Sequence, residues 1–433
     1  MKTEIIYPQF AKDRGVRYWL RPRNLWAARF KFLRRDFSNN WRRKFEQAGP
    51  TVHPSRSVPF SDLLQPGRST SNFRFLILGD TGEGDRSQYG LLPLIRSLDP
   101  DFMIINGDVA YPAGRHEDFI NGFFEPYRNL RIPIWAVPGN HEYYSPNDGQ
   151  EFFEIFCTQK WGQLWADNGL VLRPQPGTYW ELRGSSRNPP LVLIGLDSGK
   201  KGNLDRDDSG SADDRQYNWL EARLRAAERD ELKVIILFHI PALVDGKNES
   251  KVGLGRLHRI LASSPSVRLV VCGHIHNYQR YDPGVFGNYL HDVHQAIPKQ
   301  PIHYIVNGGG GAALGSPKFK GAFQAETYPT PKAWDAQFNL GEKLLFWSPL
   351  AKSSLGKLAI STYEAAVNDG DAAQLLSFLV VDVRNGVVEV TSVFMDDLAQ
   401  LFQGIPSVEV MNPAVRVDPS KLATCLQTKK IVL

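Results

Sequence analysis

Ile105-Asn106-Gly107-Asp108-Val109-Ala110-Tyr111 is the stretch from which the fold of this chain is predicted. The apolar run before it, residues 102–105, ends abruptly in Asn-Gly-Asp. A buried parallel strand typically delivers a polar side chain in this way, at the sheet edge where ligands bind. A single Asp after a strand carries little information, so the weight of this stretch depends on whether similar strand ends recur.

Similar strand ends do recur along the chain. Apolar runs at residues 73–78, 134–137, 191–196, 233–238, 267–271 and 303–306 end in Asp, Asn or His. Helical patterns lie between them, at residues 87–98, 116–130, 151–166, 214–229 and 251–262. This alternation is typical of a layered α/β fold. Residues 376–383 and 387–394 flank Asn385-Gly386, which predicts a hairpin with a tight type I′ turn.

Length and composition describe an ordinary globular protein. The 433 residues can form one large domain with additions, or two domains, and 42% are hydrophobic and 22% charged. No run approaches the ~20 apolar residues of a membrane span, and the first residues have no signal-peptide core. Three cysteines without CxxC spacing, Cys157, Cys272 and Cys425, argue against a disulfide framework or a cysteine zinc site. We therefore expect a cytoplasmic protein.

The first 70 residues differ from the rest in charge. They hold 15 Lys and Arg against 5 Asp and Glu, whereas the remainder holds 36 against 41. Six large apolar residues recur at steps of three or four, which predicts one face of a helix: Trp26, Phe30, Leu33, Phe37, Trp41 and Phe45. This basic helix packs on the catalytic region, lies on an anionic membrane or contacts nucleic acid; packing is favoured, and specific nucleic-acid binding is not expected.

These differences divide the chain into three parts. We predict an appendage and linker at residues 1–70, a catalytic domain at residues 71–395 and a tail at residues 396–433. The Gly-, Pro- and aromatic-rich residues 312–373 are expected to form an insertion or lid beside the site.

The residue types at the strand ends suit a binuclear metal centre. Two ions ~3.5–4 Å apart can hydrolyse a phosphate ester, and a carboxylate bridges them best. Asp108 is the natural bridge. Mixed oxygen and imidazole ligands suit iron, manganese or zinc, and such ions convert water into a hydroxide nucleophile near neutral pH. Other side chains are expected to be structural or solvated: Arg115, His116, His53, His258, His291, His294 and His303.

Five motifs carry a family resemblance. They are Gly79-Asp80-Thr81-Gly82, Gly107-Asp108-Val109-Ala110-Tyr111, Gly139-Asn140-His141-Glu142, Phe238-His239-Ile240-Pro241 and Gly273-His274-Ile275-His276-Asn277-Tyr278. Because these motifs occur in this order, the chain resembles the calcineurin-like metallophosphoesterases, and within them the purple acid phosphatase branch. The resemblance covers about residues 73–311 and the terminal hairpin. It implies a four-layer α/β/β/α sandwich, but it does not reach the basic helical appendage, which is predicted separately from charge and periodicity.

The resemblance also implies residue roles. The first metal ion would be bound by Asp80, Asp108, Tyr111 and His276, and the second by Asp108, Asn140, His239 and His274. His141 would be catalytic, just outside the metal shell and near the leaving group. The implied cofactors are two metal ions, Fe(III) with Fe(II), Mn(II) or Zn(II), and the implied substrate is a phosphomonoester or a phosphodiester. The alternative is a membrane- or nucleic-acid-associated binding protein with a vestigial metal site.

Two positions distinguish this chain within the superfamily. Most members have a histidine where this chain has Gly82, so a ligand is missing. Tyr111, three residues after Asp108, compensates for that loss and favours Fe(III) in the first site. The alternative for Tyr111 is an aromatic side chain packed beside Pro112. The purple phosphatases usually carry another histidine after the one matching His239, but residues 242–250 contain none.

Overall fold

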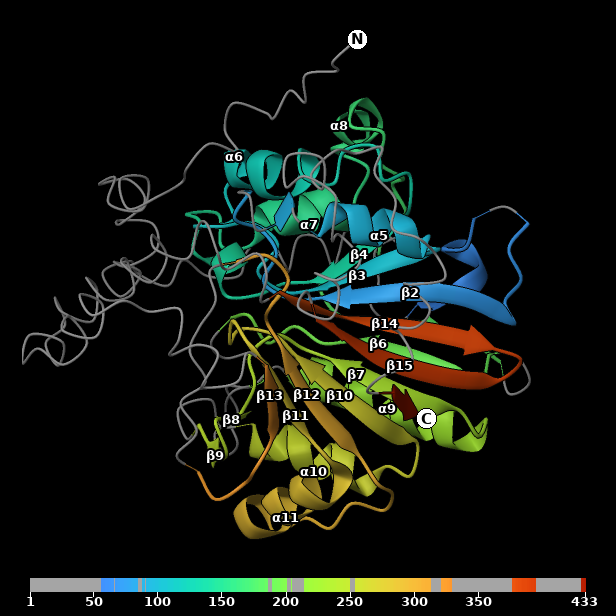
Figure 1. Cartoon of the computed structure of the whole chain (residues 1–433), viewed down its shortest axis with the longest axis vertical. Helices are drawn as coiled ribbons and strands as arrows, with labels where there is room; N and C mark the ends of the chain where they lie inside the picture. The colour runs from blue at the N-terminus through green and yellow to red at the C-terminus, as the bar shows by residue number, and fades with distance from the viewer. Residues whose placement is uncertain are drawn as a thin grey trace, which may run out of the picture.

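The computed structural model describes most of the predicted catalytic region (Figure 1). The described residues are 56–65, 67–84, 88–89, 91–185, 189–200, 204, 214–249, 254–312, 321–328, 376–394 and 430–433. The basic helix, His53 and most of residues 312–373 lie outside them, so the expectations for those segments stay predictions. None of the helices in the described ranges is long and apolar enough to cross a membrane.

One sheet has six strands, in the order β16-β15-β14-β2-β3-β4. β2 (Asn72–Leu78), β3 (Phe102–Asn106) and β4 (Ile134–Val137) are parallel. β14 (Ser377–Arg384) and β15 (Val387–Phe394) form the predicted hairpin, and β16 (Lys430–Val432) pairs with β15. Asn385 and Gly386 have φ angles of 49° and 84°, which a type I′ turn requires.

The other sheet has eight strands, in the order β1-β5-β6-β7-β10-β12-β11-β13. Its parallel centre is β6 (Leu191–Gly195), β7 (Lys233–Leu237), β10 (Val267–Cys272) and β12 (His303–Asn307). β1 (Ser57–Pro59), β5 (Trp180–Arg183), β11 (Tyr278–Tyr281) and β13 (Glu326–Tyr328) complete it. The short hairpin of β8 (Leu243–Val244) and β9 (Lys247–Asn248) follows β7.

Strand β2 shows how the two sheets are layered. Phe75 and Ile77 belong to an apolar core shared with Leu193 and Ile235 of the other sheet. Leu76 and Leu78, of opposite parity, pack in a second core on the outer face. Alternate side chains of a strand point to opposite faces, so a strand buried on both faces is apolar throughout. This is why residues 73–78 contain so few polar side chains.

Helices cover both outer faces, which completes four layers (Figure 1). α5 (Leu92–Leu98), α7 (Gln150–Phe156) and α8 (Gly162–Asp167) lie on the six-stranded sheet. α9 (Asp214–Arg229), α10 (Gly255–Ser263) and α11 (Pro283–His294) lie on the eight-stranded sheet. The arrangement is the α/β/β/α sandwich that the resemblance implies.

Several helices differ from their predicted bounds. α5 begins five residues later than expected, and residues 151–166 form α7 and α8 with a break between them. The predicted helix at residues 116–130 is α6 (His116–Phe119) followed by the π-helical turn η4 (Ile120–Phe124). α11 was not predicted because it contains Pro and Gly. Pro283 occupies the first turn, where its missing N–H costs nothing, and Asp282 caps the Val285 N–H.

Two segments expected to lie outside the catalytic domain contribute to its sheets. In the predicted linker, β1 pairs with β5, and Phe60 of η3 (Phe60–Asp62), Leu63 and Leu64 are buried between the sheets. In the predicted tail, β16 extends the six-stranded sheet. The prolines at positions 54, 59 and 66 suggested a linker, but the apolar residues between them pack into the core.

Candidate metal centre

The candidate ligands lie where the two sheets meet at their carboxyl ends. Asp80, Asp108 and Asn140 follow β2, β3 and β4, while His239 and His274 follow β7 and β10. The centre therefore draws side chains from both sheets. All of these positions follow parallel strands, whose carboxyl ends share one edge.

Asn106 links the two sheets by hydrogen bonds at this point. Its Nδ2 donates to the carbonyl oxygens of Phe238 at 3.2 Å and Val271 at 3.0 Å, at the ends of β7 and β10. Its own carbonyl oxygen lies 3.0 Å from Nδ1 of His239. Because a carbonyl only accepts, this contact places a proton on Nδ1 and leaves Nε2 directed at the centre. The sequence alone predicts no role for Asn106.

Three candidate ligands have a left-handed backbone. The φ angles of Asp80, Asp108 and His274 are 58°, 50° and 70°. Such angles are uncommon outside glycine and cluster at functional sites. They turn the chain sharply at the strand end, so that His274 and His276 can both reach the centre.

Glu142 holds the turn that carries Asp108. Its buried carboxylate accepts the N–H groups of Asp108 at 3.1 Å, Ala110 at 3.0 Å and Gly139 at 2.6 Å. Burial and the nearby Asp108 charge raise the pKa of Glu142 to about 8. The sequence alone predicts no role for Glu142, although this residue belongs to the Gly-Asn-His-Glu motif.

The first predicted ligand group converges on the Tyr111 hydroxyl. The hydroxyl oxygen lies 3.2 Å from Oδ1 of Asp80, 3.1 Å from Oδ2 of Asp108 and 3.0 Å from Nε2 of His276. His276 Nε2 also lies 3.3 Å from Asp80 Oδ1. The four side chains named for the first metal thus meet at one point. The Tyr111 ring is buried, but its hydroxyl faces the carboxylates rather than a purely apolar environment.

The second predicted group meets beside Nε2 of His239. That nitrogen lies 3.1 Å from Oδ2 of Asp108 and 3.2 Å from Oδ1 of Asn140. Ligand atoms of Asp108, His239 and His274 all lie within 4.8 Å of one another. Oδ2 of Asp108 contacts both groups, which is the geometry expected of a bridging carboxylate.

His141 lies beside these groups and is more accessible. Its Nδ1 is 2.7 Å from the Pro112 carbonyl oxygen, and its Nε2 is 4.0 Å from Oδ2 of Asp108. The side chain is 18% exposed, against 1% for Asp108. The carbonyl contact places the proton on Nδ1, so Nε2 is the atom directed toward the centre.

Carboxylates and imidazoles of the centre shift one another's pKa values. Burial acts to raise the pKa of Asp108, but the positive charges of His239 and His141 outweigh it and hold that pKa below its usual range. Burial acts to lower the pKa of His239, but Asp108 and Asp80 raise it to about 10. Burial and the His239 charge lower the pKa of His274 to about 4.

Carboxylate, amide, imidazole and phenol donors together form a set that suits transition metals. Burial and the charges of Asp108 and Asp80 raise the pKa of Tyr111 well above its usual value. A cation among these donors would lower the pKa of Tyr111, because it stabilises the phenolate. It would also replace the proton that lies between His239 and Asp108. The described residues therefore fit metal ions in both charge and donor type.

Gly82 leaves no room for a side chain. A Cβ atom there would lie 2.0 Å from the Val109 carbonyl oxygen and 2.5 Å from the Ala110 backbone nitrogen. The Gly82 carbonyl oxygen accepts the Tyr111 N–H at 2.9 Å. The backbone that delivers Tyr111 thus passes through the space that a histidine at position 82 would need. A histidine at position 82 is therefore incompatible with this course of the backbone.

The residues expected to be structural lie outside the two ligand groups. Arg115 is held by Asp118 at 2.8 Å and Glu117 at 3.2 Å, and the His116 ring stacks on Trp161 at 4.2 Å. The other histidines within the described ranges contact groups elsewhere: His258 and His294 contact each other, His291 contacts Asp292, and His303 lies in β12.

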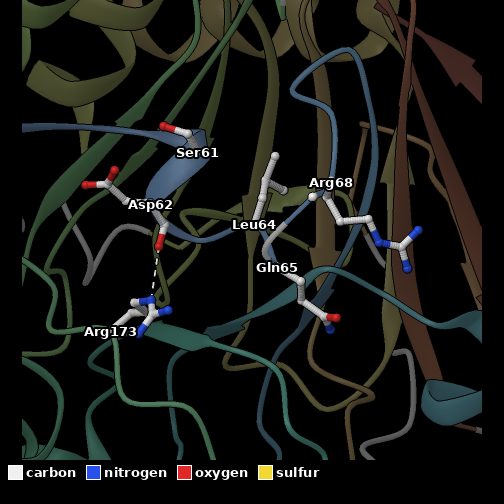
Figure 2. Close-up of a pocket in the computed structure, with 7 residues that line it drawn as sticks. Ser61, Asp62, Leu64, Gln65, Arg68 and Arg173 are labelled. Atoms are coloured by element: carbon white, nitrogen blue, oxygen red, sulfur yellow. Dashed lines mark hydrogen bonds between the residues drawn. The ribbon is translucent and has the colours of Figure 1, made fainter.

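A cavity of about 530 Å³ lies elsewhere, lined by Ser61, Asp62, Leu64, Gln65, Gly67, Arg68 and Arg173 (Figure 2). Arg173 donates to the Asp62 carbonyl oxygen at 3.2 Å. Arg68 pairs with Asp99 and Asp101, just before β3, whereas Asp108 follows the other end of that strand. The cavity is therefore separate from the candidate metal centre.

Comparisons with known proteins find similar chains over the catalytic region. Residues 73–278 match the family model described as calcineurin-like phosphoesterase. An uncharacterized protein of Mycobacterium tuberculosis is 26% identical over 287 residues, covering 60% of this chain and 50% of that protein. Purple acid phosphatase 21 of Arabidopsis thaliana is 26% identical over 243 residues, covering 54% of this chain and 49% of that protein. The chain spans about half the length of these curated relatives.

Among solved structures, the chain is similar to a purple acid phosphatase from yellow lupin seeds. The TM-score is 0.43 and the identity 17%, over 77% of this chain and 53% of the lupin chain.

Proposed function

We propose that this protein, whose residues 73–278 match the calcineurin-like phosphoesterase family model, is a metal-dependent phosphoric ester hydrolase with a binuclear centre. The observation that carries the proposal is the position of Asp108. Its Oδ2 lies 3.1 Å from the Tyr111 hydroxyl of one ligand group and 3.1 Å from Nε2 of His239 of the other. One carboxylate oxygen shared by two donor sets is what a two-ion site needs.

The proposed ligands fall into two sets that share Asp108. Asp80, Tyr111 and His276 complete the first set, and Asn140, His239 and His274 complete the second. A phenolate with two carboxylates favours Fe(III), whereas imidazoles with an amide suit Fe(II), Mn(II) or Zn(II). Such ions, when bound, neutralise phosphoryl charge and activate water for attack on phosphorus.

His141 is proposed to act on the leaving group. The Pro112 carbonyl fixes its ring, and its Nε2 faces the centre from a partly exposed position. A positioned imidazole can donate a proton to a leaving oxygen or hold a phosphoryl oxygen. Burial lowers the pKa of His141, while the Asp108 charge opposes that shift. The substrate class is proposed only as a phosphomonoester or a phosphodiester.

The test is hydrolysis by metal-loaded protein. Apoprotein is loaded with Fe(III) together with Zn(II) or Mn(II), its metal content is measured, and p-nitrophenyl phosphate is compared with bis(p-nitrophenyl) phosphate. We expect turnover of at least one ester, lost on chelation and reduced at least about 1000-fold in Asp108→Ala, because a two-metal clamp supplies most of the rate. His291→Ala is the control, since that histidine is exposed and paired with Asp292.

The proposal fails if protein carrying two ions hydrolyses neither ester, or if Asp108→Ala retains full turnover. The first outcome would favour the alternative, a binding protein with a vestigial site. The convergence of seven donor side chains supports the enzyme, because a site under no catalytic demand is free to lose ligands.

A further inference from the structure

Tyr144 contacts two neighbouring residues of the metal centre through different parts of its side chain. Its hydroxyl oxygen accepts from Nδ2 of Asn140 at 2.8 Å. Its ring centroid lies 4.6 Å from that of His141. Tyr144 directly follows the 3₁₀ turn η5 (His141–Tyr143), and its N–H donates to the His141 carbonyl oxygen at 3.2 Å. This turn brings the ring back over the two residues that begin it.

The contact with Asn140 bears on which end of the amide faces the centre. Only the oxygen of a carboxamide can bind a cation, because the NH₂ group has no available lone pair. Oδ1 of Asn140 lies 3.2 Å from Nε2 of His239, among the proposed ligands, while Nδ2 is directed to the Tyr144 hydroxyl. An amide anchored at its nitrogen presents its oxygen without first having to rotate. Without the hydroxyl, the rotation that turns NH₂ toward the centre becomes less costly.

The contact with His141 restricts the ring proposed to act on the leaving group. His141 touches two tyrosine rings, Tyr111 with centroids 4.2 Å apart and Tyr144 at 4.6 Å. Its Nδ1 is held by the Pro112 carbonyl at 2.7 Å. The hydrogen bond fixes one ring atom, and the aromatic contacts restrict rotation about it. Removing the Tyr144 ring leaves two of these three restraints.

We infer that Tyr144 is a positioning residue, whose hydroxyl directs the Asn140 amide oxygen toward the metal centre and whose ring holds His141 in its reactive orientation. The inference rests on the proposed function. It goes beyond that function by assigning metal affinity and ring placement to separate parts of one side chain. The geometry therefore predicts that the two effects can be separated by substitution.

The experiment compares Tyr144→Phe, which removes only the hydroxyl, with Tyr144→Leu, which also removes the ring. Tyr289→Phe is the matched control, because its hydroxyl donates to Oδ1 of Asn248 at 2.9 Å, away from the proposed ligands. Binding of Zn(II) and Mn(II) to each apoprotein is measured by competition with a chromophoric chelator. This readout does not require turnover.

Of the two bound ions, the one held less tightly should bind about 10–100-fold more weakly to both Tyr144 variants than to wild type, as is typical when a residue that orients a ligand is lost. At saturating metal, Tyr144→Phe should keep kcat within about 3-fold, whereas Tyr144→Leu should lower kcat about 10-fold or more with a smaller change in KM. Tyr289→Phe should match wild type in both measurements.

Unchanged metal affinity in Tyr144→Phe would overturn the role of the hydroxyl, and equal kcat in the two Tyr144 variants would overturn the role of the ring. If the wild type binds two ions but hydrolyses neither ester, the proposed function fails, while the metal titration still decides the first role. In that case the imidazole signals of ¹⁵N-histidine-labelled, Zn(II)-loaded protein decide the second. The His141 signal should shift in Tyr144→Leu and stay in place in Tyr289→Phe. Tyr144→Phe keeps the ring volume, so it serves the test if Tyr144→Leu does not fold.

Discussion

Tyr111 supplies the one phenol oxygen among the proposed ligands. Its hydroxyl lies within 3.2 Å of Asp80, Asp108 and His276. We expect Fe(III)-loaded wild-type protein to show a visible tyrosinate charge-transfer band, and Tyr111→Phe to lose it, because phenylalanine has no oxygen to bind iron. Absorption spectroscopy checks this at equal iron content, with Tyr289→Phe as the control. A band that survives in Tyr111→Phe would show that the tyrosine is only a packed aromatic.

Gly82 provides a second test at the same scale. Even a methyl group at position 82 would lie 2.0 Å from the Val109 carbonyl oxygen, so Gly82→Ala has to displace the loop that carries Tyr111. We expect destabilisation of about 1–3 kcal/mol from overpacking, together with a weaker charge-transfer band. Urea unfolding and absorption measure the two effects. Gly162→Ala is the control, since the closest neighbour of its added Cβ lies 3.6 Å away. Wild-type behaviour in both measurements would contradict the steric account.

The proposed ligands are predicted because five sequence motifs resemble those of a known family, and their side chains lie together in the structure. The residues that position them could not be predicted. Asn106, Glu142 and Tyr144 act through contacts with residues from other parts of the chain or across a turn, and no local pattern encodes those contacts. Glu142, for example, binds the backbone of a loop more than 30 positions earlier.

At the scale of elements, α10 and α11 are joined by two histidines, the buried His258 and the half-buried His294. Nδ1 of His258 lies 3.0 Å from Nε2 of His294, which in turn lies 3.0 Å from the Tyr289 hydroxyl. Nε2 of His258 is buried without a hydrogen-bond partner among the described residues. Burial, with the charges of His294 and Arg259, lowers the pKa of His258 well below its usual value. The neutral ring is therefore the form that the folded protein accommodates.

This pair predicts a loss of stability in acid. In the unfolded chain His258 titrates near its ordinary pKa of about 6.5, while in the folded protein it stays neutral to lower pH. As pH falls below about 6.5, only the unfolded state gains the proton, so this residue lowers the unfolding free energy by up to about 1.4 kcal/mol per pH unit until the folded pKa is reached. Urea unfolding is measured at several pH values between 7.5 and 5.5. The unfolding free energy should change less per pH unit in His258→Gln than in wild type. His291→Gln is the control, and equal slopes in wild type and His258→Gln would contradict the prediction.

Elements were predictable where one period dominates the sequence. α9 has the predicted bounds, residues 214–229, because its apolar residues follow a single helical spacing. α11 was missed because its first turn contains Pro283 and Gly284, which read as breakers until Asp282 is recognised as the cap. β5 and β11 were also missed. Each is only four residues long, and each pairs with two other strands: β5 with β1 and β6, and β11 with β12 and β13.

At the scale of the whole molecule, all proposed ligands lie between residues 80 and 276. Removing residues 1–50 should therefore leave metal content and kcat within about 2-fold of the full chain, because no proposed ligand is lost. Co-sedimentation with vesicles containing phosphatidylserine, with and without these residues, tests the membrane alternative for the basic helix. Equal sedimentation of the two forms would favour packing on the catalytic region. Loss of metal on truncation would contradict the assignment of the centre.

The hydrogen bonds that Asn106 makes from β3 to the ends of β7 and β10 also have a thermodynamic consequence. The proposed ligands come from both sheets, so ion binding at the centre acts as a cross-link between the two halves of the sandwich. By linkage, free metal at 100 times its dissociation constant adds about 2.7 kcal/mol to the unfolding free energy for each independent site. The melting temperature should accordingly rise with free-metal concentration, and chelation should lower it to a plateau. The Asn106 hydrogen bonds contribute to the melting temperature of the metal-free protein, because they hold the two sheets together at the centre before any ion binds.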